Sequence, residues 1–186
     1  MFCPTCGSAL APGGPAREEE RKLVTVLFAD VTGSTALGER LDPERLRALL
    51  TAYFAAMSAV IESWGGTVEK FIGDAIMAVF GVPIVREDDP ERALRAGLDM
   101  LSRLRDLNRE FEQRHGVTLQ IRIGVNTGDV IAPVGGPVEQ MIVSGDAVNV
   151  AARLEQAAEP GTVLAGERTY LATRNAFRFE PPVAWS

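Results

Sequence analysis

The chain has 186 residues, of which 46% are hydrophobic and 24% are charged, and its formal net charge is -6 at pH 7. That length allows one domain with a substantial core, and the composition is ordinary for a soluble globular protein. The acidic balance argues against a nucleic-acid-binding protein, because neutralising phosphates needs clustered Lys and Arg. The 19 Lys and Arg residues are instead scattered among Glu and Asp, as on a solvated helix surface.

The sequence also argues against a membrane protein. Its longest apolar run, Ala75 to Val85, is too short to cross a bilayer and is interrupted by Gly81 and Pro83. The N-terminus does not show the basic and apolar segments of a secretory signal. We therefore expect a cytoplasmic protein whose partners are neither a membrane nor a nucleic acid.

The first 22 residues differ from the rest of the chain. Cys3 and Cys6 form a CxxC turn followed by glycine, which in a zinc knuckle directs two thiolates toward one Zn²⁺ ion. These are the only two cysteines, and the sole histidine, His115, lies far along the chain, so Cys and His alone cannot complete a four-ligand site. The segment FCPTCGSAL resembles the second half of a bacterial zinc ribbon. A remnant or intermolecular zinc knuckle and a disordered tail both remain open interpretations.

The globular part opens with a predicted central strand. Leu23–Ala29 is a nearly continuous apolar, β-branched run that ends at Asp30. A turn of small residues, Val31–Thr35, then leads toward a long amphipathic helix. That helix is predicted to begin at Asp42-Pro43 and to end before Gly65-Gly66.

A hairpin is predicted over Val68–Phe80. The pair Gly73-Asp74 separates two apolar runs, and Gly-Asp is a favoured two-residue hairpin turn. Period-two alternation puts Lys70, Ile72 and Asp74 on one side of the ribbon. Taken alone, Asp74 is best explained as a solvated turn residue.

The remaining elements alternate between helix and strand. A second long helix is predicted from Asp89-Pro90, and a strand over Leu119–Val125 is followed by a turn at residues 127–129. After that turn we expect a hairpin partner at 130–134, a short strand at 139–143, a helix at 146–157, a strand at 162–165, a helix at 167–173 and a last strand at 177–180.

This order predicts an α+β fold. The pattern β-α-β-β-α-β-β, followed by a β-α-β tail, favours a ferredoxin-like βαββαβ core with a mainly antiparallel sheet and helices packed on one face. We assign residues 1–22 to the partial zinc knuckle and a flexible linker, residues 23–180 to the globular domain and residues 181–186 to a truncated tail.

Three elements could carry chemistry. Asp30 ends a strand before a Gly/Ser/Thr turn, whose backbone N–H groups can hold phosphate oxygens. If the hairpin lies beside that strand, Asp74 brings a second carboxylate to the same sheet edge, and two carboxylates with nucleotide phosphates and waters can hold Mg²⁺. The spacing of Asn149 and Arg153 puts an amide and a guanidinium on one helix face, where the arginine can stabilise a developing phosphoryl charge.

Each of these signals also has a plain alternative. Asp30 could simply cap the following helix. Asn149 and Arg153 could make surface pairs with Glu155 or Glu159.

Four segments, taken together and in order, resemble the signature segments of class III nucleotidyl cyclase catalytic domains. They read FADVTGST, VEKFIGDAIMAVFG, IRIGVNTGDV and SGDAVNVAARLE, and the resemblance covers about Lys22 to Phe179. The stretch FGVPIVREDDPERALRAG is similar to the soluble bacterial branch, which often has an N-terminal zinc ribbon. The resemblance therefore implies a class III nucleotidyl cyclase fold and cyclase activity.

The resemblance also implies a role for individual residues. Asp30 and Asp74 fall on the two aspartates that bind a pair of Mg²⁺ or Mn²⁺ ions, with the backbone of Val31 beside them. Lys70 falls on the lysine that reads the adenine ring. The implied triphosphate-contacting turn is formed by Thr32, Gly33, Ser34 and Thr35.

Asn149 and Arg153 fall on the asparagine that orients the ribose and the arginine that stabilises the transition state. Such domains work as head-to-tail dimers, so the two groups of residues would come from different chains. The implied reaction is attack of the ribose 3′-hydroxyl on the α-phosphate of ATP, giving 3′,5′-cyclic AMP and pyrophosphate.

Ile142 departs from the family pattern. It occupies the second base-reading position, usually Asp or Thr, but its side chain can neither donate nor accept a hydrogen bond. The sequence therefore predicts an adenylate cyclase, with Lys70 favouring ATP. The alternatives are a non-catalytic nucleotide-binding or regulatory domain and a cyclase with relaxed selection between ATP and GTP.

Overall fold

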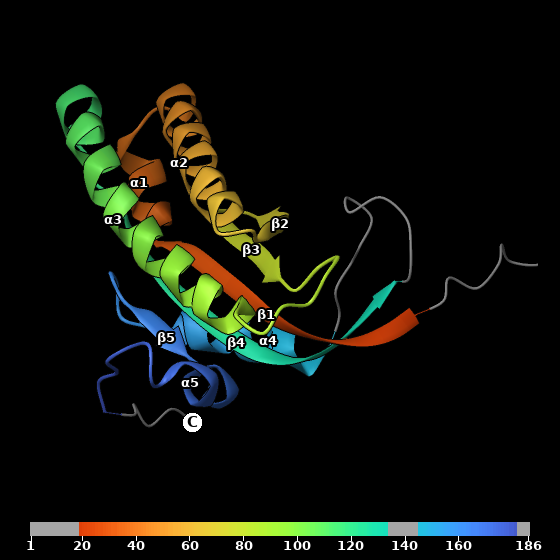
Figure 1. Ribbon diagram of the computed structural model, residues 1–186. Helices are drawn as coiled ribbons and strands as arrows, with labels where there is room; N and C mark the ends of the chain where they lie inside the picture. The colour runs from red at the N-terminus through yellow and green to blue at the C-terminus, as the bar shows by residue number, and fades with distance from the viewer. Residues whose placement is uncertain (1–18, 134–144, 182–186) are drawn as a thin grey trace, which may run out of the picture.

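The computed structural model describes residues 19–133 and 145–181. Within them, five strands form one sheet in the order β2-β3-β1-β4-β5, and five helices pack around it (Figure 1). The strands are β1 (Glu19–Thr32), β2 (Thr67–Ile72), β3 (Ala75–Phe80), β4 (Gln120–Pro133) and β5 (Val163–Ala165). The helices are α1 (Ser34–Arg40), α2 (Pro43–Ser63), α3 (Asp89–His115), α4 (Asp146–Ala157) and α5 (Glu167–Thr173).

Strand β1 is the centre of the sheet. It pairs antiparallel with β3 on one side and, over its whole length, antiparallel with β4 on the other. Strand β5 joins β4 in parallel, so the sheet is mixed but mainly antiparallel. The predicted α+β architecture is confirmed, although β1 begins at Glu19 rather than at Leu23.

Both faces of β1 are buried, which explains its uninterrupted apolar run. Leu27 and Ala29 belong to a core cluster that contains the apolar stripes of α2 and α3. Val26 and Phe28, on the opposite face, belong to a second cluster that contains Ala147 of α4. Because side chains alternate between the faces of a strand, a strand covered on both sides must be apolar at successive positions.

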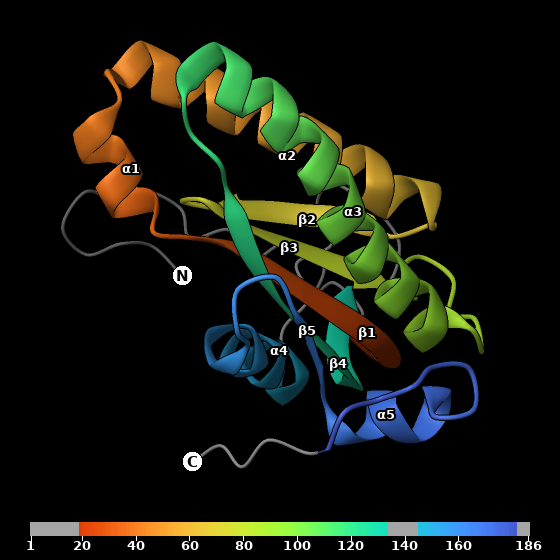
Figure 2. The same cartoon turned by 90° about the vertical axis from the view of Figure 1, so that its left-hand side faces the viewer.

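Helices cover both faces of the sheet, which corrects the expectation that they would lie on one face. Figure 2 shows α2 and α3 on one side of the sheet and α4 on the other. The apolar face of α4 includes Ala147, Ala151 and Leu154. It covers the side of β3 that presents Met77 and Val79, and this side would otherwise be exposed.

Strand β4 is continuous, so the turn predicted at residues 127–129 is wrong. The ladder with β1 runs through all three of these residues. Thr127 is buried, and its hydroxyl lies 2.9 Å from the hydroxyls of both Thr25 in β1 and Thr169 in α5. The turn-like sequence Thr-Gly-Asp is therefore explained by packing against neighbouring elements.

The last predicted strand, at residues 177–180, is also wrong. The chain there has no strand geometry. The rings of Phe177 and Phe179 pack edge to face with centroids 6.3 Å apart, and Phe179 packs against Tyr170 of α5 at 5.0 Å. The alternation of aromatic residues thus reflects ring packing rather than strand pairing. The short strand predicted at 139–143 lies outside the described residues.

Helix α2 begins where the sequence predicts. The Asp42 carboxylate accepts a hydrogen bond of 2.9 Å from the backbone N–H of Arg45, and Pro43 occupies the first turn. Among the helices of residues 19–133 and 145–181, α2 alone is long and apolar enough to cross a membrane. Its residues Tyr53 and Met57 are fully buried in the core cluster, so its apolar stripe packs against the sheet.

Helix α4 lies directly on β4, because glycines let the two backbones approach. A Cβ on Gly124 would lie 2.3 Å from the nitrogen of Glu155 and 2.4 Å from the carbonyl oxygen of Ala151. A Cβ on Gly128 would lie 2.8 Å from the Cβ of Ala147. The glycines of the IRIGVNTGDV segment therefore set the distance between α4 and the sheet.

Substitution of Gly124 by alanine should push α4 off the sheet. We expect Gly124→Ala to lower the free energy of unfolding by about 3 kcal/mol, as for a severely overpacked core, measured by urea denaturation. Gly97→Ala, in the interior of α3, is the matched control, because its Cβ would meet Val163 at an ordinary 3.4 Å. Equal stability of the two variants would contradict the role given to Gly124.

Candidate active site

Two carboxylates meet at one end of the sheet. Asp30 lies near the C-terminal end of β1, and Asp74 lies in the turn between β2 and β3. In the β1–β3 ladder Ala29 pairs with Ile76, which places Asp74 diagonally across from Asp30. Gly73 has a φ of 64°, so it supplies the left-handed residue that the tight turn needs.

The two carboxylates affect each other electrostatically. Burial raises the pKa of Asp30, and the negative charge of Asp74 raises it further. Hydrogen bonds from Arg122 and from the backbone N–H of Val31, together with the charge of Arg122, lower the pKa and oppose this effect. The ionised form of Asp30 is thus disfavoured in the free protein, and a cation beside it would favour that form.

Arg122 is the partner of Asp30 that the sequence did not reveal. The β1–β4 register places Arg122 directly opposite Asp30. Its Nη2 donates to Oδ2 of Asp30 at 3.2 Å, and its Nη1 donates to the carbonyl oxygen of Gln156 at 3.3 Å. The guanidinium therefore connects β1 to the last turn of α4.

Glu155 of α4 completes this cluster. Its Oε1 forms an ion pair with Nε of Arg122 at 2.6 Å, and its side chain is only 7% exposed. Burial raises the pKa of Glu155, while the nearby charge of Arg122 lowers it. The plain alternative, in which Glu155 pairs with Asn149 or Arg153 at the surface, does not hold, because Glu155 is buried.

A signal for Glu155 does exist in the sequence. Glu155 lies on the same helical stripe as Ala147, Ala151 and Leu154, where a charged residue is unexpected. A carboxylate on an apolar stripe needs a buried partner. Only the strand register shows that Arg122 is that partner.

The carboxylate pair fits a divalent cation. Asp30 and Asp74 supply hard oxygen ligands. Burial, and after it the charge of Asp74, raises the pKa of Asp30, and a bound cation would oppose both effects. No group of three or more His, Cys, Asp or Glu residues able to hold a metal occurs in the described part of the chain. The remaining ligands would therefore come from water, the main chain and a bound substrate.

Lys70 lies on the same face of the sheet as Asp30. It pairs across the hairpin with Met77, which pairs in turn with Phe28 of β1. Asp30 follows Phe28 by two residues and so projects to the same side. Two strand spacings, about 10 Å, separate β2 from β1. The Lys70 side chain is 44% exposed, so its ammonium is accessible.

The predicted phosphate turn follows β1. The hydroxyl of Thr32 donates to the carbonyl oxygen of Gln120 at 3.0 Å, which ties the end of β1 to β4. Gly33 has a φ of 73°, and this conformation lets the chain turn into α1. Ser34 and Thr35 form the first turn of that helix. Their role as phosphate ligands remains a prediction.

Asn149 and Arg153 lie on the exposed side of α4, four residues apart. Neither has a contact with Asp30 or Asp74 among the contacts of the described residues. A single chain therefore does not bring all the predicted catalytic residues together. Three further predicted residues, Ile142, Cys3 and Cys6, fall outside the described ranges.

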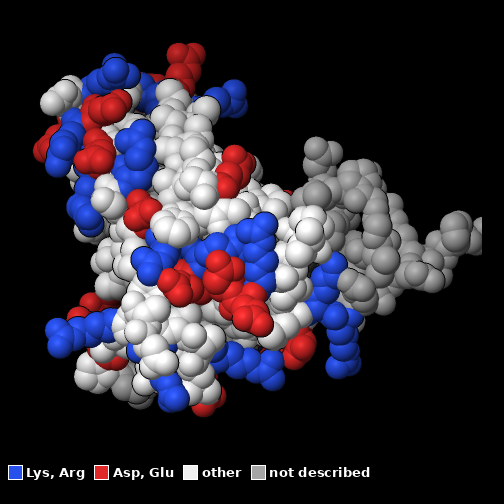
Figure 3. Space-filling view, in the orientation of Figure 1, with Lys and Arg blue, Asp and Glu red and all other residues white. Residues whose placement is uncertain are grey.

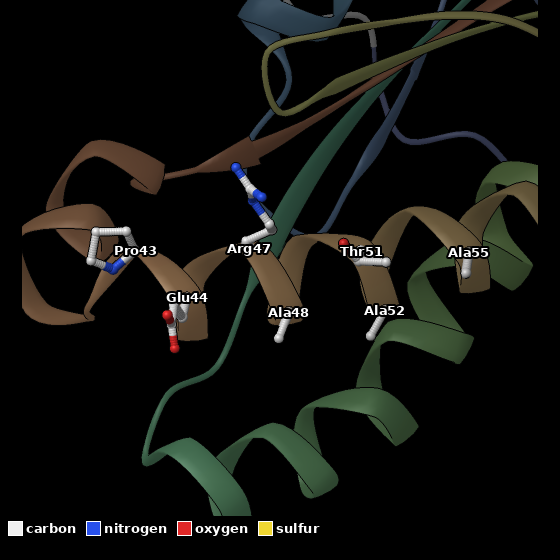
Figure 4. A pocket seen from close by; sticks show the side chains of 7 residues that line it. All are labelled: Pro43, Glu44, Arg47, Ala48, Thr51, Ala52 and Ala55. Carbon is white, nitrogen blue, oxygen red and sulfur yellow. The ribbon is translucent and has the colours of Figure 1, made fainter.

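Two further surface features of the described residues differ from the acidic pair. Acidic and basic groups are interspersed on the face seen in Figure 3. A hollow of about 710 Å³ lies along the outer side of α2 (Figure 4). Its only carboxylate is that of Glu44, so it lacks the paired acids of a metal-dependent site. Its lining residues are Pro43, Glu44, Arg47, Ala48, Thr51, Ala52 and Ala55.

Comparison with known families identifies the domain. The model of the adenylate and guanylate cyclase catalytic domain matches residues 16–182. The chain therefore belongs to this family, which confirms the resemblance found in its signature segments. Cyclases of this family generally use divalent metal ions, in agreement with the acidic pair at the sheet edge.

Individual relatives include both kinds of cyclase. The adenylate cyclase of Anabaena cylindrica is 34% identical over 158 residues, which are 80% of this chain but only 30% of that protein. The adenylyl cyclase CyaB from P. aeruginosa superposes with a TM-score of 0.79 at 35% identity, covering 86% of this chain and 84% of that one. The guanylyl cyclase Cya2 superposes with a TM-score of 0.76 at 34% identity, covering 82% and 79%. These similarities confirm the fold. Because the relatives include both adenylyl and guanylyl cyclases at similar identity, they do not identify the nucleotide substrate.

Metal binding at Asp30 and Asp74 should appear in thermal unfolding. At ten times its Kd, Mg²⁺ or Mn²⁺ should stabilise the wild-type fold by about 1.4 kcal/mol, with a much smaller effect on Asp30→Asn. In metal-free buffer Asp30→Asn should unfold at the same or a higher temperature. The reason is that the raised pKa of Asp30 means that folding disfavours its ionised form, and asparagine mimics the protonated one.

The control for that experiment is Asp106→Asn, which changes an exposed acid on α3. It should respond to metal as the wild type does. An unchanged metal response in Asp30→Asn would place the cation elsewhere.

Proposed function

We propose that the protein is an adenylate cyclase that converts ATP to 3′,5′-cyclic AMP and pyrophosphate at the interface of a cytoplasmic head-to-tail homodimer. The observation that carries this proposal is the carboxylate pair of Asp30 and Asp74, with the Arg122 guanidinium beside it. Membership of the cyclase family supports the reaction class. The choice of ATP rests on Lys70.

The acidic pair accounts for the chemistry at phosphorus. Asp30 and Asp74, with the main chain of Val31, would hold two Mg²⁺ or Mn²⁺ ions. When bound, such ions lower the pKa of the ribose 3′-hydroxyl and neutralise charge on the phosphates. The O3′–Pα bond forms as the bond from Pα to the pyrophosphate oxygen breaks, and the hydroxyl proton passes to solvent.

Arg122 supplies a fixed positive charge near the phosphates. Its Nη2 contacts Asp30 in the free protein, while Glu155 and the Gln156 carbonyl hold the other nitrogens. A cation at Asp30 would replace this contact and leave Nη2 available for a phosphate oxygen. Glu155 would keep the guanidinium in place during the exchange, so little reorganisation is needed.

The exposed side of α4 supports a two-chain active site. Asn149 would orient the ribose, and Arg153 would stabilise the charge that develops on the phosphoryl group. Both residues lie on the solvent side of α4 and make no contact with Asp30 or Asp74 of their own chain in the described residues. A second copy of the chain in a head-to-tail arrangement would bring them to the acidic pair.

Base selection depends on Lys70 and Ile142. The lysine can donate to N1 of adenine, whereas guanine presents an N–H at that position, so Lys70 favours ATP. Ile142 offers no hydrogen bond, and a missing neutral hydrogen bond costs about 0.5–1.5 kcal/mol. This residue favours relaxed selection between ATP and GTP as the second candidate function. A non-catalytic nucleotide-binding domain remains the alternative that predicts binding without turnover.

The proposal is tested by product formation. Purified protein with Mg²⁺ or Mn²⁺ should form cyclic AMP from ATP faster than cyclic GMP from GTP, with the products separated by chromatography. Asp30→Ala should lower the rate by about a hundredfold to a thousandfold, the scale of losing one preorganised electrostatic contact, while Asp106→Ala should not. Absence of product with either nucleotide, at concentrations that permit dimerisation, would contradict the proposal.

The head-to-tail arrangement predicts complementation. Lys70→Ala and Asp74→Ala chains should each be nearly inactive, because every site in either homodimer lacks one group. In a mixture, heterodimers would contain one intact site, so activity should recover to about a quarter of the wild-type value if half of the dimers are mixed. No recovery on mixing, with subunit exchange verified by light scattering and labelled chains, would exclude this arrangement.

A further inference from the structure

Glu69 and Lys70 are neighbours in β2 whose charged groups meet. The Nζ of Lys70 lies 3.2 Å from Oε1 of Glu69. Neighbours in a regular strand point to opposite faces, so such a contact is unusual. The β2–β3 register shifts between Val68 and Lys70, which leaves Glu69 as the extra residue. A bulge of this kind re-aims a side chain, and here it brings the carboxylate to the ammonium.

The two side chains differ in their environment. Lys70 is 44% exposed, whereas Glu69 is only 10% exposed. Both carboxylate oxygens of Glu69 are buried, and neither makes a hydrogen bond within the described ranges. A buried carboxylate in that state is unfavourable, so its presence needs an explanation beyond fold stability. Its one ion pair among the described residues is with Lys70.

The location of Lys70 supplies that explanation. Through Met77 and Phe28 it lies on the sheet face that also carries Asp30, and in the proposed head-to-tail dimer it would serve the site built on the acidic pair of the second copy. A free lysine side chain is flexible, and ordering its ammonium on binding costs conformational entropy. A neighbouring carboxylate that holds the ammonium before the ligand arrives removes part of this cost. The ammonium keeps its outward side available because Lys70 is still exposed.

We propose that Glu69 is a positioning residue that holds the ammonium of Lys70 in place for the nucleobase and so sets base selection. The inference rests on the proposed function, because it takes Lys70 as the group that reads the base. Exposed ion pairs contribute little, since water screens them and both chains lose freedom. The Glu69 carboxylate differs because it is withdrawn from water and its backbone is fixed in the hairpin.

Binding of non-hydrolysable ATP and GTP analogues, measured by calorimetry with Mn²⁺, tests this role. Glu69→Gln should weaken ATP analogue binding about tenfold, the effect of losing one charge-assisted contact, and should leave GTP analogue binding nearly unchanged. Glu69→Asp keeps the negative charge, so it should retain part of the preference for the ATP analogue over the GTP analogue. The matched control is Glu91→Gln, which breaks the exposed Glu91–Arg95 pair on α3 and should leave the ratio unchanged.

A double-mutant cycle separates positioning from a general structural effect. Lys70→Ala should lower the ATP-to-GTP binding ratio, and adding Glu69→Gln to it should lower the ratio no further. Equal weakening of both analogues by Glu69→Gln, or full additivity with Lys70→Ala, would overturn the inference.

The same measurements distinguish this inference from the proposed function. A wild-type protein that binds the analogues with a Glu69-dependent ratio but forms no cyclic nucleotide would refute catalysis and leave the role of Glu69 intact. A protein that forms cyclic AMP, but whose ATP-to-GTP binding ratio does not depend on Glu69, would support catalysis and refute the role of Glu69. Failure to bind either analogue would overturn both.

Discussion

The candidate active site depends on one guanidinium group that joins three elements. Arg122 of β4 contacts Asp30 of β1 together with Glu155 and the Gln156 carbonyl of α4. Burial raises the pKa of both carboxyl groups, and the positive charge of Arg122 opposes that effect in each. Removal of the arginine would leave two poorly hydrated carboxylates without compensation, which is a strongly destabilising change. Arg122 therefore links α4 to the sheet and favours the charged form of Asp30 beside Asp74.

Helix α4 has different roles on its two sides. Its inner side can carry Glu155 down to Arg122 only because Gly124 lets the helix backbone approach β4. Its outer side carries Asn149 and Arg153, which make no contact with the acidic pair of the same chain in the described residues. A single short helix therefore both supports the acidic pair of its own chain and presents polar groups outward.

Local patterns in the sequence predicted much of the fold. The helices at residues 146–157 and 167–173 have the predicted bounds, because caps and helical periodicity depend on nearby residues. The Thr-Gly-Asp run in β4 was wrongly predicted to be a turn, because its conformation is decided by contacts with β1, α4 and α5. Asp30 and Asp74 could be proposed as site residues because each follows an apolar run in the sequence. Arg122 could not be proposed from the sequence, because its role depends on its position opposite Asp30 in a ladder between distant segments.

The long central ladder has a consequence for how the chain folds. The β2–β3 hairpin closes over a two-residue turn, but even the nearest residues that pair between β1 and β4, Thr32 and Gln120, are 88 positions apart. Contacts across such separations form only after a large loop-closure entropy has been overcome. We expect the hairpin with Asp74 to form early and the Asp30–Arg122 contact to form late. The complete site would then be assembled only in chains that have finished folding, and partly folded chains would lack it.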